Sequence, residues 1–116
     1  MPNNNLRNIT EGTEVRASLI AIKAELKDEG SVSAFKKDEL YDKELFVKLL
    51  SHEDPKVRKN AVLIMGVLSD NEYAKYIYEA YVKEDKFFVR SSYLKALSSY
   101  DYSEYEEELL KRMKQL

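Results

Sequence analysis

A valine followed by an arginine occurs three times in the chain, each time at the start of a similar short pattern. The three copies are Val15-Arg16, Val57-Arg58 and Val89-Arg90, and they lie 42 and 32 residues apart. In each copy, two small or polar residues precede an apolar pair at the fourth and fifth positions after the valine. This spacing places apolar side chains on one face of an α-helix, whereas a strand needs them at every second position. We therefore expect three similar helices, with room between them for partner helices and turns.

The composition supports helices over a sheet. Only three glycines and two prolines are present among 116 residues, which leaves little material for the many turns of a β-sandwich or barrel. Apolar residues make up 44% of the chain, enough for one core. The predicted fold class is all-α. We assign residues 1–9 to a flexible N-terminal segment and residues 10–116 to a single domain of helical repeats.

Start and stop signals place the other helices. Asp42 is the expected cap of a short helix over residues 42–50, and Asp54-Pro55 starts the second Val-Arg helix, which runs to about residue 68. Further helices are expected around residues 73–81, over about residues 86–99, and after Ser103, where Glu106 completes a capping box. We expect Gly30-Ser31 to end the first helix. Residues 29–41 are then an irregular connection with one or two helical turns.

Two of these helices have distinctive patterns. Residues 61–68 are apolar around nearly the whole circumference, so this helix is predicted to be buried on all sides, between the first and third Val-Arg helices. Gly66 is expected to let a neighbouring helix approach closely. The C-terminal helix instead has one apolar stripe and charges elsewhere, which is typical of a capping helix.

The segment His52-Glu53-Asp54-Pro55-Lys56-Val57-Arg58, followed by the apolar Ala61-Val62-Leu63-Ile64, resembles the turn and second helix of HEAT repeats. The resemblance covers residues 42–99, although Lys86-Phe87-Phe88 stands where the first repeat has Pro55-Lys56. It implies a short HEAT-like α-α superhelix of stacked antiparallel helix pairs. It also implies a scaffold that binds another protein, or a downstream domain of its own chain, without catalysis of its own.

A weaker resemblance concerns the N-terminal part. Residues 4–12, followed by Val15-Arg16 and Leu19-Ile20, are similar to the helical domain that precedes the catalytic domain in some bacterial RNA methyltransferases. This resemblance implies an RNA-binding accessory domain of a larger enzyme that uses S-adenosylmethionine. The glycine-rich cofactor motif of such a catalytic domain does not occur in the sequence.

Residues for catalysis or metal binding are scarce. The chain has no cysteine and one histidine, His52, to which we assign no role, and it lacks the glycine-rich motifs of nucleotide sites and the Gly-x-Ser-x-Gly motif of hydrolases. We expect no catalytic, cofactor-binding or metal-binding residue and no small-molecule substrate. The net charge of −2 offers no bulk attraction for nucleic acid or membranes, and no run of about 18 apolar residues occurs. A cytoplasmic location without membrane contact is expected.

The repeated arginines allow two interpretations. They either contact phosphates or an acidic partner, or they pair with carboxylates in the turns, such as Asp54 and Asp85, and so tie one repeat to the next. We favour the second role for Arg16, Arg58 and Asp54, and we expect Arg58 to be coupled to Asp54. Tyrosines 73, 81, 93 and 100 fall on inward stripes. The candidate contacts for a partner, protein or RNA, are Lys59, Arg90, Ser91, Lys95, Ser98, Tyr76 and Tyr78.

Overall fold

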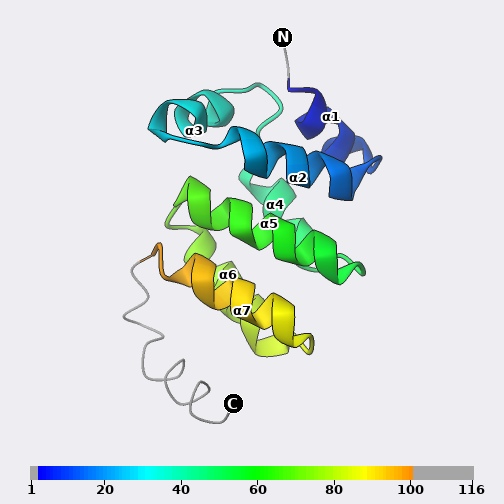
Figure 1. The fold of residues 1–116 in the computed structure, drawn as a ribbon, viewed down its shortest axis with the longest axis vertical. Helices are drawn as coiled ribbons and strands as arrows, with labels where there is room; N and C mark the ends of the chain where they lie inside the picture. The colour runs from blue at the N-terminus through cyan, green and yellow to red at the C-terminus, as the bar shows by residue number, and fades with distance from the viewer. Residues whose placement is uncertain (1–2, 101–116) are drawn as a thin grey trace.

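The computed structural model of the chain describes residues 3–100, and in this range it contains helices and no strands (Figure 1). This confirms the all-α class. The helices are α1 (Asn4–Glu11), α2 (Val15–Glu25), α3 (Glu29–Lys36), α4 (Lys43–Leu49), α5 (Pro55–Leu68), α6 (Tyr73–Lys83) and α7 (Phe87–Leu97). The predicted C-terminal helix after Ser103 lies outside the described residues.

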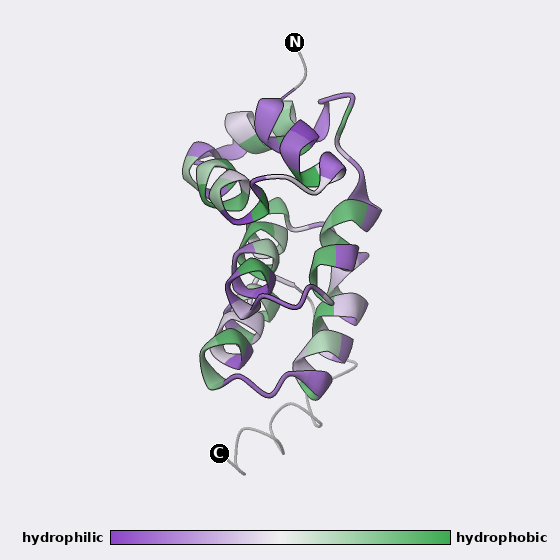
Figure 2. Cartoon of the chain, turned by 90° about the vertical axis from the view of Figure 1, so that its right-hand side faces the viewer, coloured by the Kyte–Doolittle hydropathy of each residue, from purple (hydrophilic) through white to green (hydrophobic). Residues whose placement is uncertain are grey.

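The three Val-Arg segments begin α2, α5 and α7, as predicted. Figure 1 shows these helices at successive levels of a stack, with α5 between the other two. Their partners α1, α4 and α6 pack against α2, α5 and α7 respectively. In the right-hand column of Figure 2 the hydrophilic sides face outward and the hydrophobic sides face the other column. The core therefore lies between two columns of helices.

Local signals position the ends of α4 and α5. The side chain of Asp42 accepts from the backbone N–H of Glu44, and that of Asp54 accepts from Lys56, which confirms both predicted caps. Pro55 occupies the first turn of α5, where the absent N–H costs no hydrogen bond.

The helix over residues 61–68 lies between the other two Val-Arg helices, as predicted, but it is not buried on all sides. Ile64 and Met65 are fully buried, and α5 packs against both α2 and α7. Val67, however, is 43% exposed, and Leu63 is half-buried. The helices α2, α7 and α4 pack against α5, and Val67 lies on the remaining side, where it lines a depression with residues of α3.

Gly66 makes the close approach that the sequence suggested. A Cβ atom at this position would lie 3.0 Å from the Cα and 3.1 Å from the Cβ of Ala96. These distances are shorter than most real Cβ contacts, so a side chain at this position would force Ala96 to move, and glycine suits the close packing of α5 on α7.

The assignment of residues 1–9 to a flexible segment is wrong for residues 4–9, which form most of α1. Asn3 caps this helix through its Oδ1 atom, and Leu6 and Ile9 are buried against the rest of the core. The Asn8 side chain also donates to Ser18 Oγ on α2 at 3.2 Å. A short helix of this kind is stabilised by tertiary contacts that no local pattern reveals.

The expectation for residues 29–41 also needs correction. The first Val-Arg helix already ends at Glu25, and Gly30 and Ser31 lie in the first turn of α3. Asp28 and Ser31 form a reciprocal capping box at its start. The segment thus contains a helix of about two turns, which agrees with the one or two turns expected. Gly30 and Ser31, however, belong to the start of this helix and do not end α2.

Candidate interaction surface

The first arginine of the repeat pattern links two levels of the stack. Arg16, at the start of α2, donates from Nη2 to Oδ2 of Asp54, the cap of α5, at 2.6 Å. The hydrogen bond from Arg16 lowers the pKa of Asp54 below its usual value. Asp54, a turn carboxylate expected to pair with an arginine, thus pairs with Arg16.

Arg58 forms the second link, but not with Asp54. Its Nε and Nη2 atoms donate to the two carboxylate oxygens of Glu84 at 2.8 and 2.9 Å, and its Nη1 donates to the backbone oxygen of His52 at 2.8 Å. The expected pairing of Arg58 with Asp54 is therefore wrong in its partner. Each of these two arginines instead reaches the carboxylate that precedes the next Val-Arg helix. Which carboxylate an arginine reaches depends on how one helix is shifted relative to the next, and neighbouring residues in the sequence do not reveal this shift.

Glu84 is held in its ionised form by several donors. Burial opposes ionisation, since the side chain is 3% exposed, but hydrogen bonds from Arg58, the Lys86 backbone and Tyr93 outweigh it and lower the pKa of Glu84. Such a bidentate pair with a further donor is geometrically specific and partly desolvated. Arg58 thus connects the turn before α5 with Glu84 in the turn before α7, and its structural role stays a prediction.

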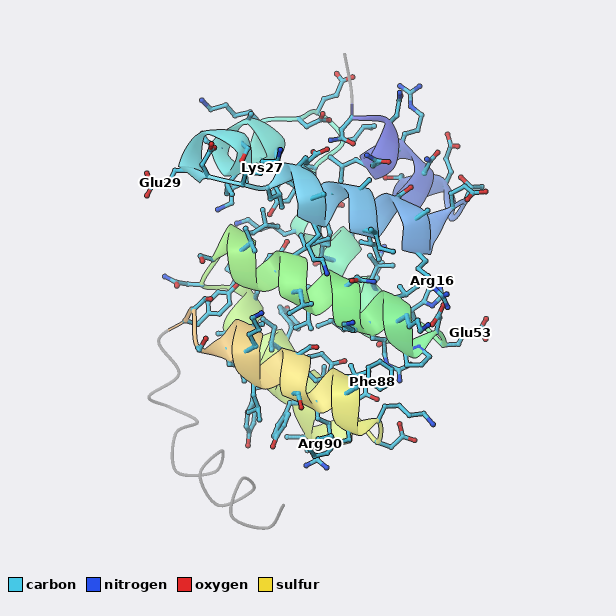
Figure 3. All side chains as sticks on the ribbon, viewed as in Figure 1. Arg16, Lys27, Glu29, Glu53, Phe88 and Arg90 are labelled. Atoms are coloured by element: carbon cyan, nitrogen blue, oxygen red, sulfur yellow. The ribbon has the colours of Figure 1, made fainter. Side chains whose placement is uncertain are left out.

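Arg90 differs from the other two arginines. Arg90 forms no ion pair among residues 3–100, so the expected pairing with Asp85 is absent there. Its guanidinium instead lies 5.4 Å from the centre of the Tyr81 ring. Its Nε atom is buried without a hydrogen-bond partner. Figure 3 shows Arg16 directed from α2 towards the start of α5, whereas Arg90 points from α7 away from the stack.

A polar groove of about 420 Å³ lies beside the Arg58–Glu84 pair. His52 lines it, and its Nδ1 atom accepts from the backbone N–H of Asp54 at 3.0 Å, which orients the ring within the turn. Within the described range, no group of three or more His, Cys, Asp or Glu side chains is placed to hold a metal ion. In the same range, no helix has both the length and the apolar character required to cross a bilayer.

The structure divides the candidate contact residues between two places. Lys95, Ser91 and Ser98 are exposed on α7 and Lys59 is half-buried on α5, whereas the tyrosines lie on α6 in the other column. Tyr76 lines the polar groove and has Lys75 Nζ 5.4 Å from its ring centre, and Tyr78 packs partly against the core. The structure therefore does not bring Tyr76 and Tyr78 together with Lys59 and Lys95. The four tyrosines expected to face inward are all buried.

The serines contribute less than their exposure suggests. Ser91 Oγ donates to the Phe87 carbonyl at 3.3 Å, and Ser98 Oγ donates to the Lys95 carbonyl at 2.6 Å. Because each hydroxyl already donates to a backbone carbonyl of α7, these serines have no free donor for a partner. Their small side chains mainly leave room for a partner to approach α7.

Two apolar residues of α5 that are not fully buried, the half-buried Leu63 and the exposed Val67, were not identified from the sequence as candidate contacts. Leu63 and Val67 follow Lys59 at spacings of four and eight residues, so the three share one stripe of the helix. Leu63 and Val67 also line a shallow depression of about 190 Å³ together with Lys95 of α7 and with Ser98 and Ser99, which follow the end of α7. We call the surface formed by Lys59, Leu63, Val67, Lys95, Ser98 and Ser99 the α5–α7 seam. In the sequence, Leu63 and Val67 belong to the apolar run of residues 61–68, from which burial on all sides was predicted, so the run gave no indication of this surface.

Comparisons of the chain with protein-family models, with curated proteins and with solved structures found no match.

Proposed function

We propose that the chain is a non-catalytic helical-repeat module, HEAT-like in its stacking, that binds another protein through the α5–α7 seam. The observation that carries the proposal is that Val67, in the last turn of the central helix α5, is 43% exposed beside the half-buried Leu63. Exposed aliphatic side chains beside a depression favour a protein partner, because burying them removes apolar surface from water. Stacked helix pairs commonly use one such extended surface for binding.

RNA binding, as in an accessory domain of a SAM-dependent RNA methyltransferase, is the alternative. The lysines of the seam favour it, because cations attract phosphates of any sequence. The tyrosines of the inward stripes do not, since they are buried and cannot stack on bases. Aliphatic side chains between the lysines offer a base no hydrogen bond, so the seam suits a protein better.

Photo-cross-linking tests the proposal. p-Benzoylphenylalanine in place of Val67 should give a protein adduct in extracts of the cells that make this chain. Val82 on α6 is the matched control, because it is 40% exposed against 43% for Val67 but lies in the other column. We expect the Val67 adduct to be lost when Lys59→Glu and Lys95→Glu are combined with the cross-linker, while circular dichroism shows an unchanged fold.

Identical adducts from Val67 and Val82 would show that the seam is not a specific interface. Adducts with RNA from Val67 alone would favour the accessory-domain alternative. The double substitution Lys48→Glu and Lys75→Glu controls for the change in net charge, since both lysines are exposed on α4 and α6, in the other column of the stack.

A further inference from the structure

The charges of the chain are divided unevenly between its helices. The helices α2, α5 and α7 carry one acidic residue, Glu25, although the whole chain has 21 acidic and 19 basic residues. Their basic residues are Arg16, Lys23, Lys56, Arg58, Lys59, Arg90 and Lys95. One column of the stack is therefore basic, and the acidic residues lie mostly in the partner helices and turns.

Only some of these cations are available to a partner. Arg16 and Arg58 are neutralised by Asp54 and Glu84. Lys23 donates to the uncharged amide oxygen of Asn60 at 3.3 Å. Lys59 and Lys95, which belong to the seam, form no ion pair within residues 3–100.

The shape of the seam follows from the close packing of its two helices. The Gly66–Ala96 contact draws α5 and α7 together, so the floor of the depression is backbone and small side chains. Leu63 and Val67 form its apolar side on α5, and Ser98 and Ser99 keep the α7 side low. Lys59 extends the α5 stripe, and Lys95 lies at the edge on α7.

We propose that the α5–α7 seam binds an acidic amphipathic helix of a partner protein, and this inference rests on the proposed function. The apolar stripe of such a helix covers Leu63 and Val67. Its flanking Asp or Glu residues reach Lys59 and Lys95, for which the described part of the chain supplies no carboxylate. An amphipathic helix in a groove is a common mode of recognition, with apolar anchors three and four residues apart. The lysines set the preferred charge of the partner, and the aliphatic side chains provide the area that is buried.

Three synthetic peptides test the charge preference on the full chain. All are about 18 residues long, so that a helix can form, and share one leucine stripe, but their flanking positions are Glu, Gln or Lys. Fluorescence anisotropy measures the Kd of each. We expect the Glu peptide to bind about tenfold more tightly than the Gln peptide, and this preference to shrink as salt is raised.

Substitutions locate the site. Lys59→Gln with Lys95→Gln should remove the preference for the Glu peptide, and Val67→Ser should weaken the Glu and Gln peptides alike. Lys48→Gln with Lys75→Gln, on α4 and α6 in the other column, is the matched control and should change neither Kd. Circular dichroism verifies that each variant keeps its helices.

Equal Kd values for the Glu and Gln peptides would overturn the inference. So would a single-stranded RNA oligonucleotide that displaces the Glu peptide and needs the same lysines. If the Val67 cross-linker still gives a lysine-dependent protein adduct while the peptides show no charge preference, the inference fails and the proposed function stands. If the cross-linker gives no specific adduct, the proposed function itself fails.

Discussion

Arg58 donates to both carboxylate oxygens of Glu84, whereas Arg90 lies over the Tyr81 ring without an ion pair in the described part of the chain. The two residues occupy the same position after a valine in two copies of one pattern. Their surroundings differ because α7 follows α5 in the stack, while no described helix follows α7. The same residue type in the same register therefore has different energetic consequences.

Replacing each arginine with alanine should lower the stability of the protein by different amounts. We expect Arg58→Ala to lower the free energy of unfolding by about 2–3 kcal/mol, because it leaves Glu84 buried without its main partner. Arg90→Ala should cost less than about 1 kcal/mol, the range of a cation–π contact near the surface. Urea unfolding measures both.

A double-mutant cycle identifies the partner. Coupling should appear between Arg58→Ala and Glu84→Gln, and not between Arg58→Ala and Asp54→Asn. Equal losses for the two arginines, or coupling of Arg58 to Asp54, would contradict the pairing seen in the structure.

Glu84 should also make stability depend on pH. Its pKa in the folded chain is lowered from the ordinary value of 4.5, so its contribution is present above pH 4.5 and is lost as pH falls through the folded pKa. The stability gap between the wild type and Glu84→Gln should therefore narrow as urea unfolding is repeated from about pH 6 to pH 3. Glu79→Gln, which changes an exposed carboxylate of α6, is the control. A gap that widens towards low pH would show that Glu84 is not held as a carboxylate.

Between helices, the approach of α5 to α7 depends on Gly66. In an exposed helix Gly→Ala stabilises by up to about 1 kcal/mol, because alanine has the better helix propensity. At Gly66 the added methyl group meets Ala96, so Gly66→Ala should instead destabilise by about 1–3 kcal/mol. Gly30→Ala in α3 is the matched control, where the nearest atom to the new Cβ is a side-chain oxygen of Asp28 at 3.4 Å. Thermal melts of both variants should move in opposite directions, and a stabilising Gly66→Ala would mean that the helices are farther apart.

The helices differ in how far local signals predicted them. The caps Asp42 and Asp54 use side chains within two residues of the N–H groups they accept from, so α4 and the start of α5 were predicted correctly. The N-terminal helix α1 has only eight residues, and its sequence is mostly polar. It was missed because its stability comes from Leu6 and Ile9 packing on the core, which is a tertiary property.

Over the whole stack, α5 is the element that joins the other Val-Arg helices. Because it packs on both α2 and α7, damage to its core should affect both neighbours together. We expect Ile64→Ala to cost about 2–5 kcal/mol and to raise hydrogen exchange in α2 and α7 alike. Val67→Ala removes a side chain that is 43% exposed and should cost less than about 1 kcal/mol. A loss below about 1 kcal/mol for Ile64→Ala, or faster exchange in one neighbour only, would contradict the central role of α5.

The all-α class, the starts of α2, α5 and α7 and the inward tyrosines were all predictable from the sequence. They depend on residues within one or two helical turns of each other, where the geometry of the helix sets which side chains share a face. The partner of each arginine was not predictable in this way. Arg16 reaches Asp54 and Arg58 reaches Glu84 across 38 and 26 residues, and these pairings depend on the offset between stacked helices.

The exposure of the α5–α7 seam likewise depended on the tertiary structure. Leu63 and Val67 belong to the same apolar run as Ile64 and Met65, and their hydropathy does not distinguish them. What distinguishes them is that α2, α4 and α7 cover the other sides of α5 and leave this one open. The candidate site is thus the side of α5 that these neighbouring helices leave uncovered, because the burial of a residue depends on its neighbours and not on the residue alone.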